Sequence, residues 1–177
     1  VAIIYNLPSK KDLKLTADLI RRIFSGTISD WSDTSIHKLN QNINQSALPI
    51  TPVHRSDSSG TTFIFTEYLS KTSSAWAINY GTGKRIQWPV GAGVSGNAGV
   101  AEMVSRIPGS IGYVSLSYAE AENLPVARIQ NRSGNFVYPS QESVSMAADI
   151  QLPDDNRIMI NNTASRNGYP ISAFTYM

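Results

Sequence analysis

The chain has 177 residues, of which 41% are hydrophobic and 16% are charged, a composition that is typical of one globular domain and excludes a disordered segment. No run approaches the ~18 consecutive apolar residues of a membrane span, and the 15 Lys and Arg residues, against 13 Asp and Glu, are too dispersed to form a basic stripe for nucleic acid. The absence of Cys excludes disulfides, thiolate nucleophiles and cysteine metal sites.

Both ends of the sequence are apolar. Residues 1–5 and residues 171–177 are each typical of a strand. Natural domain boundaries usually fall in polar, flexible linkers. We therefore expect this chain to be a piece of a larger polypeptide.

The first predicted helix follows the opening strand. The apolar residues that recur at helical spacing are Leu15, Leu19, Ile20, Ile23 and Phe24. Thr16 is available as the N-cap and Gly26 as the stop. Further along, the sequence predicts a turn at 30–33, a surface loop at 40–46 and a strand at 50–53.

Residues 54–69 are the most informative part of the chain. Thr, Phe and Ile favour a strand here, but the preceding serines are N-cap types and apolar side chains follow at intervals of four residues. We therefore predict a helix that begins near Ser59 or Gly60.

The rest of the chain continues to mix helices and strands. The predicted elements are a turn at 81–83, a helix from about 97 to 107, a strand at 111–114, a helix at 116–122, a strand at 126–129, a hairpin turn at 132–135, a strand at 136–137 and a helix at 141–148. The order contains no internal repeat. The fold class is therefore α/β, with a mixed β-sheet flanked by helices, in a single domain over residues 1–177.

The predicted strand-to-helix connection contains the physical parts of an oxyanion site. Amides at a helix N-terminus lack intrahelical partners and the helix dipole favours negative charge there. Ser59 and Thr61 add hydroxyl donors, and Gly60 lets an anion approach the main chain. Arg55 offers paired charged donors, and Asp57 could hold its guanidinium or accept a proton from the anion. The alternative is a plain helix cap beside a solvent-exposed ion pair.

Three other sequence patterns are weaker evidence for a functional site. Residues 91–96 match the glycine pattern of a dinucleotide-binding turn, but the acidic residue expected about 20 positions later is missing, and the alternative is a plain glycine-rich connection. His54, Asp57 and Ser59 lie too close in sequence for a hydrolase triad. His37 and His54 are too few and too far apart to predict a metal site. We predict no metal and no cofactor.

Six segments carry motifs in a characteristic order. They are VAIIYNLP at 1–8, LT followed by IFSGTISDW within 15–31, ITPVHRSDSSGTT at 50–62, WPVG and GNAGVA within 88–101, PGSIGYV at 108–114, and YPI with FTY within 169–176. Together they resemble the phosphate-binding proteins of bacterial phosphate ABC transporters, the PstS family, over almost the whole chain.

The resemblance implies one lobe of a type II periplasmic-binding-protein, or venus-flytrap, fold. This lobe is inserted between two segments of the first lobe, which is missing here, and the runs 1–5 and 171–176 would be the strands that cross to it. Such proteins are monomers that capture inorganic phosphate between their lobes, in the periplasm or on the extracytoplasmic cell surface, and deliver it to an ABC permease.

The same resemblance carries the ligand contacts of the family onto this chain. They fall on Arg55, Ser59, Gly60 and Thr61, and Asp57 would brace the Arg. We therefore expect phosphate binding without catalysis. Three alternatives remain open: a phosphate sensor or scavenger without a permease, an assembly domain, and a phosphate-ester hydrolase that uses Ser59 or Asp57 as nucleophile.

Overall fold

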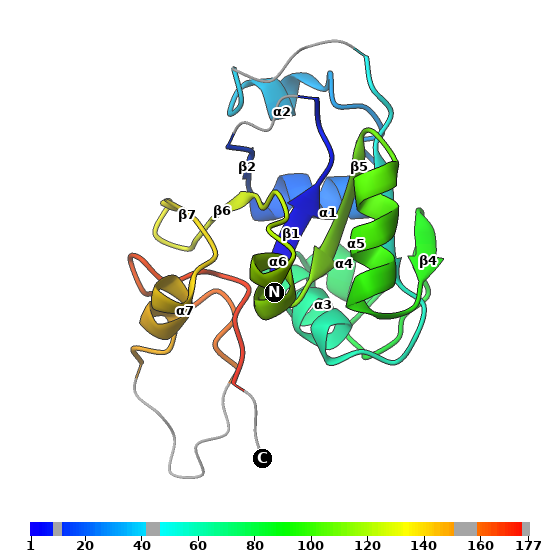
Figure 1. Ribbon diagram of the computed structural model, residues 1–177. Coiled ribbons are helices and arrows are strands. Elements are labelled where there is room, and N and C mark those ends of the chain that lie inside the picture. Colours follow the sequence, from blue (N-terminus) through cyan, green and yellow to red (C-terminus); the bar gives the residue numbers. More distant parts are fainter. Residues whose placement is uncertain (9–11, 42–46, 151–158, 175–177) are drawn as a thin grey trace.

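The computed structural model describes residues 1–8, 12–41, 47–150 and 159–174, and Figure 1 shows how strands and helices alternate along them. In chain order the elements are β1 (Ala2–Tyr5), β2 (Lys14–Leu15), α1 (Ala17–Phe24), α2 (Thr34–His37), β3 (Thr51–Arg55), α3 (Gly60–Thr72), α4 (Ser74–Asn79), β4 (Ala92–Val94), α5 (Gly96–Arg106), β5 (Ser110–Val114), α6 (Leu116–Ala121), β6 (Arg128–Gln130), β7 (Phe136–Val137) and α7 (Gln141–Ala147). Within these ranges no helix is long and apolar enough to cross a membrane.

The main sheet has four strands in the order β1-β5-β3-β4. β5, β3 and β4 run parallel, with Thr51 opposite Ser110 and Arg55 opposite Val94, whereas β1 is antiparallel to β5. Parallel strands end at the same edge of a sheet, so the segments that follow β3, β4 and β5 are brought together there.

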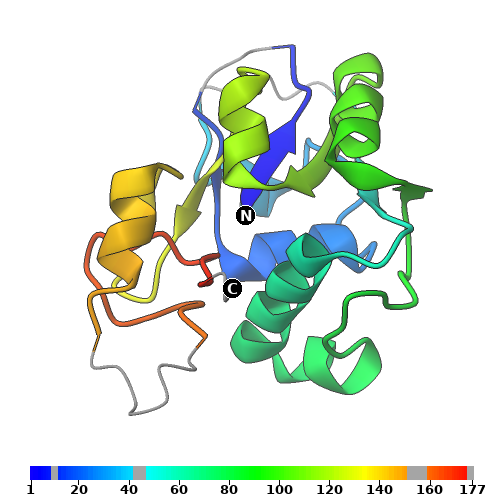
Figure 2. The same cartoon turned by 60° about the horizontal axis from the view of Figure 1, so that its bottom comes forward.

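Side chains of the main sheet alternate between two apolar layers. Ala2 and Ile4 pack into the cluster beneath α5 and α6, whereas Ile3 and Tyr5 pack into the larger cluster that includes α1, α3 and α4. Figure 2 shows the sheet between these two helical layers. This three-layer arrangement agrees with the predicted α/β class.

α5 packs directly on β5 because of a glycine. A Cβ at Gly112 would lie 2.8 Å from the Val100 side chain and 3.0 Å from the Val104 side chain. A larger residue would push the helix away from the sheet.

A second, smaller sheet has the order β2-β6-β7. β6 and β7 form the predicted hairpin, whose turn includes Gly134 at a φ of +86°. α7 lies beside this sheet and is joined to the C-terminal segment by the Tyr169 amide, which donates to the Ser143 carbonyl at 2.9 Å. The structure thus contains two mixed sheets where the sequence predicts one.

Most of the predicted elements are confirmed. α1, α5, β5, α6 and α7 begin and end within about two residues of their predicted bounds, α3 begins at Gly60 as predicted, and Thr16 caps α1 by accepting from the Leu19 amide. β3 extends the predicted strand as far as Arg55. The predicted strand at 126–129 is displaced, because Val126 makes only an isolated bridge to Ile4 before β6 begins.

Several expectations are wrong in detail. Leu15 belongs to β2 and not to the first helix, and α2 and α4 are not predicted. Asn40 is buried instead of lying in a surface loop, because its side chain accepts from the Lys14 main-chain amide at 2.8 Å and donates to the Lys14 carbonyl at 2.9 Å. Residues 42–46 of that loop lie outside the described residues.

The expected second crossing strand is also not observed in its described part. Residues 171–174 form no strand, and residues 175–177 lie outside the described residues. The two ends are nevertheless close, since the Val1 amine donates to the Ile171 carbonyl at 2.8 Å.

Candidate functional site

Polar residues follow each of the three parallel strands at the edge where the strands end. β3 ends at Arg55, and α3, α5 and α6 begin after the N-cap residues Ser59, Ser95 and Ser115. Three helix N-termini, with their unpaired amides, therefore lie along one edge of the sheet. This edge is where the sequence predicts an anion site.

Arg55 and Asp57 form a tight ion pair at this edge. Arg55 Nε donates to Asp57 Oδ1 at 2.6 Å, and Nη2 donates to Oδ2. The Arg55 side chain is only 11% exposed and that of Asp57 is 33% exposed, which is not the solvent-exposed pair of the alternative interpretation. The hydrogen bonds from Arg55 hold the pKa of the Asp57 carboxyl well below its usual range, and they raise the pKa of Arg55 in turn.

The guanidinium has donors to spare after these contacts. It carries five N–H groups, and three of them are used: Nε and one on Nη2 for Asp57, and one on Nη1 for Asn97 Oδ1 at 3.2 Å. One donor on each Nη atom remains. Asp57, by contrast, is an occupied acceptor, because its Oδ1 also accepts from the Gly96 amide at 3.2 Å.

The beginning of α3 contributes main-chain donors. Ser59 is the N-cap, and its Oγ accepts from the Thr62 amide at 3.2 Å while its carbonyl accepts from the Phe63 amide. Among the described residues, the amides of Gly60 and Thr61 have no protein acceptor. A Cβ at Gly60 would meet nothing within 4 Å, so the space beside the Gly60 Cα is open.

Four residues of this edge escape the sequence-based prediction. Gly96 and Asn97 contact the ion pair, and Tyr113 Oη accepts from the Arg55 amide at 3.1 Å and bonds Thr62 Oγ1 at 2.7 Å. Ser115 Oγ accepts from Asn97 Nδ2 at 3.1 Å. Burial raises the pKa of Tyr113 to about 12, so it remains a neutral hydroxyl. The signal available was that these residues lie on or directly after neighbouring strands.

The surroundings of His54 bear on the hydrolase alternative. His54 stacks on Trp88 with ring centroids 4.9 Å apart, and its Nδ1 lies 3.3 Å from the Arg55 carbonyl; among the described residues it makes no hydrogen bond to Ser59. Burial lowers the pKa of His54, so its neutral form is favoured. No group of three or more His, Asp or Glu within the described ranges could hold a metal ion.

The dinucleotide interpretation of residues 91–96 is wrong. Ala92–Val94 is itself a strand, paired with β3, and does not form the turn between a strand and a helix that this motif requires. The glycine-rich segment instead contains the edge strand β4, and its last glycine, Gly96 at a φ of +72°, begins α5 and donates its amide to Asp57.

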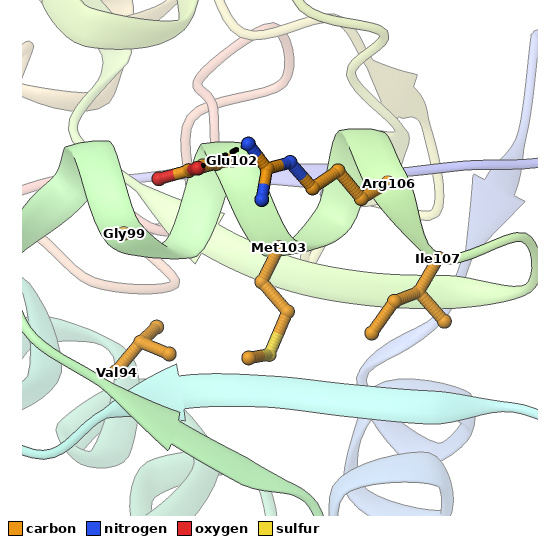
Figure 3. A pocket seen from close by; sticks show the side chains of 6 residues that line it. All are labelled: Val94, Gly99, Glu102, Met103, Arg106 and Ile107. Carbon is orange, nitrogen blue, oxygen red and sulfur yellow. Dashed lines mark ion pairs between the residues drawn. The ribbon is translucent and has the colours of Figure 1, made fainter.

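A separate pocket lies between α5 and the edge strand β4, and Figure 3 shows Met103 directed into it. Its lining is mainly apolar, and its only charged side chains are Glu102 and Arg106, which pair with each other at 2.7 Å. None of the predicted ligand residues lines this pocket.

Comparison with known proteins identifies relatives of this chain. A family model described as the PBP superfamily domain matches residues 1–177. The phosphate-binding protein PstS of Pasteurella multocida is 42% identical over 179 residues, which cover 98% of this chain and 52% of that protein. The PstS of Methanocaldococcus jannaschii is 42% identical over 197 residues, covering 100% of this chain and 50% of that protein. The chain spans about half the length of the curated relatives it matches.

Solved structures share the fold. A high affinity periplasmic phosphate-binding protein (PfluDING) with bound phosphate superposes with a TM-score of 0.70 at 24% identity, covering 96% of this chain and 52% of that one. A human phosphate binding apolipoprotein gives a TM-score of 0.68 at 20% identity, covering 96% and 54%. The fold is therefore that of periplasmic binding proteins, and the relatives are named as binding proteins rather than enzymes.

Proposed function

The chain belongs to the PBP superfamily domain family, and from this membership we propose that it binds inorganic phosphate and provides half of the phosphate site of a two-lobed binding protein. The ligand contacts of this half are Arg55, Ser59, Gly60 and Thr61, with Asp57 holding the guanidinium. Its relatives of about twice the length, named phosphate-binding protein PstS, support the choice of phosphate.

One observation carries the proposal: the connection from β3 to α3 presents donors without protein acceptors. Two guanidinium N–H groups of Arg55 and the amides of Gly60 and Thr61 are available there, at the positive end of the α3 dipole. A tetrahedral oxyanion has acceptors on every side, so it can take several of these donors at once.

This half-site should be weak by itself. Charge-assisted hydrogen bonds contribute about 1.5–3 kcal/mol each and an exposed helix terminus about 0.3–1 kcal/mol. Because association costs several kcal/mol and one side of the anion stays in water, we expect about −4 kcal/mol, which corresponds to a Kd of about 1 mM.

An amide NMR titration of the ¹⁵N-labelled chain with phosphate, with sulfate in parallel, tests the proposal. We expect the amides of residues 59–62 to shift selectively and to saturate near millimolar concentration. Sulfate should also cause shifts, because both Asp57 oxygens already accept hydrogen bonds from Arg55 or the Gly96 amide, which leaves Asp57 little capacity to select a protonated anion.

Two arginine variants sharpen this experiment. Arg55→Ala should remove the phosphate-dependent shifts, whereas Arg106→Ala should leave them unchanged. The second variant removes the same charge from an exposed i,i+4 pair with Glu102 on α5, so it is a matched control. Equal effects of both variants, or no shift at residues 59–62 in the wild type, would contradict the proposal.

The role of the whole protein follows from the same relatives. We propose that it is the extracytoplasmic solute-binding component of a phosphate ABC transporter, monomeric, with the missing lobe closing over the anion. A gene adjacent to permease and ATPase genes would favour transport, and a lone gene would favour a sensor or scavenger that lacks a permease. Co-purification with a permease encoded beside its gene would support transport, and light scattering would test the monomer.

A further inference from the structure

The first two residues of α5 contact both members of the Arg55–Asp57 pair. Asp57 occupies the Nε and Nη2 side of the guanidinium, whereas Asn97 Oδ1 accepts from Nη1 at 3.2 Å. The Gly96 amide donates to Asp57 at 3.2 Å. α5 is distant in sequence, yet it contacts the ion pair from outside the β3–α3 connection that carries Arg55 and Asp57.

The two partners of Asn97 determine how its amide is oriented. Nδ2 donates to Ser115 Oγ at 3.1 Å, and this hydroxyl is itself fixed as the N-cap of α6, where it accepts from the Tyr118 amide at 3.3 Å. A flipped amide would place an NH₂ group against the guanidinium NH₂ group, two donors with no acceptor between them. The hydrogen-bond network thus assigns Oδ1 to Arg55.

The contact matters because Asp57 holds only the Nε and Nη2 side of the guanidinium. The Gly96 amide ties the Asp57 carboxylate to α5, but on the Nη1 side Asn97 is the hydrogen-bond partner among the described residues. Asn97 adds a point of attachment on α5, a helix that packs on β5 through Gly112. With both sides of the guanidinium held, the two unused N–H donors keep one direction.

We propose that Asn97 is a positioning residue, which strengthens phosphate binding by fixing the orientation of the Arg55 guanidinium without itself needing to contact the anion. This inference rests on the proposed function. It predicts two effects of removing the Oδ1 acceptor: the guanidinium becomes mobile in the anion-free chain, and the half-site binds phosphate more weakly.

The test compares Asn97→Leu, which has a similar shape but no acceptor, with Asn97→Asp, which keeps one. In the anion-free chain, ¹⁵N spectra of the arginine side chains should give resolved Arg55 Nη protons for the wild type and Asn97→Asp, and averaged signals for Asn97→Leu. Phosphate affinity of Asn97→Leu should fall about fivefold to tenfold. Asn97→Ala replaces the Leu variant if that protein does not fold.

Ser140→Ala is the matched control for stability. Ser140 caps α7 with a capping box and lies outside the site, so its loss should lower stability while the Arg55 signals and the phosphate affinity stay within twofold of wild type. A purely structural role of Asn97 would make the two variants behave alike.

Three results would overturn the inference. The first is unchanged Arg55 signals in Asn97→Leu, and the second is changed signals with less than a twofold loss of affinity. The third is a wild-type chain that shows no phosphate response although its Arg55 signals depend on Asn97. In that third case the proposed function has failed, and the affinity part of the inference fails with it while the orientation result stands.

Discussion

In the proposed site, the hydroxyl of Ser59 has both a structural and a binding task. Its Oγ accepts from the Thr62 amide, which satisfies one unpaired amide of α3, and its proton is left for an anion. The Ser59 side chain is buried, so its orientation is set by the helix it caps. A cap with this second role is indistinguishable from an ordinary cap in the sequence.

Replacing Ser59 by Ala should separate the two tasks when compared with Thr16→Ala. Thr16 caps α1 in the same way, accepting from the Leu19 amide at 3.2 Å. Each variant should lose about 1 kcal/mol of unfolding free energy in urea titrations, because each loses a helix cap. Only Ser59→Ala should also weaken the phosphate-induced shift of Thr61. Similar binding losses in both variants would show that stability, and not the hydroxyl, controls binding.

At the level of elements, the site depends on how closely α5 approaches the sheet. β3 and β5 supply Arg55 and Tyr113, and the beginning of α5 supplies Gly96 and Asn97. The short distance between α5 and β5 is possible because Gly112 has no side chain. Packing far from the anion therefore sets the contact between Asn97 and the guanidinium.

Gly112→Ala should destabilise the chain through the Val100 side chain. The new Cβ would lie 2.8 Å from Val100 Cγ1, and overpacking of this kind costs about 1–3 kcal/mol. The double variant Gly112→Ala, Val100→Ala removes the clashing methyl group and should be more stable than the sum of the two single effects, by about 1 kcal/mol. Additive losses in urea unfolding would mean that α5 does not press on this glycine.

At the level of the whole molecule, the chain is about half of its curated relatives and one side of the proposed site stays open. An anion between two lobes loses its remaining water and gains donors from the other side, and electrostatic attraction is stronger where water is excluded. The low affinity expected of this chain is a consequence of that geometry.

A longer protein that includes the second lobe should therefore bind phosphate at least about a thousandfold more tightly than this chain. Isothermal titration calorimetry on both proteins, in the same buffer and at the same pH, measures the ratio. Equal affinities would mean that the residues at the start of α3 already form the complete site, and the two-lobed proposal would be abandoned.

The local features of this protein follow from residues that are close together in the chain. The α/β class, the caps at Thr16 and Ser59, and the helix after the Arg-Ser-Asp segment were all predictable, because helical periodicity and capping depend on residues within a few positions of each other. The candidate ligand residues were predictable for the same reason, since Arg55 and Thr61 belong to one continuous connection. Whether they bind phosphate remains a proposal.

The surroundings of that connection come from distant parts of the chain. Asn97 is 42 residues from Arg55 in sequence, and Tyr113 is 58 residues away; they meet because β3, β4 and β5 run parallel and end at one edge. Asn40 was misplaced for a related reason, since its polar side chain is buried by pairing with the backbone of Lys14. Strand order and register depend on contacts between distant segments, which local periodicity does not encode.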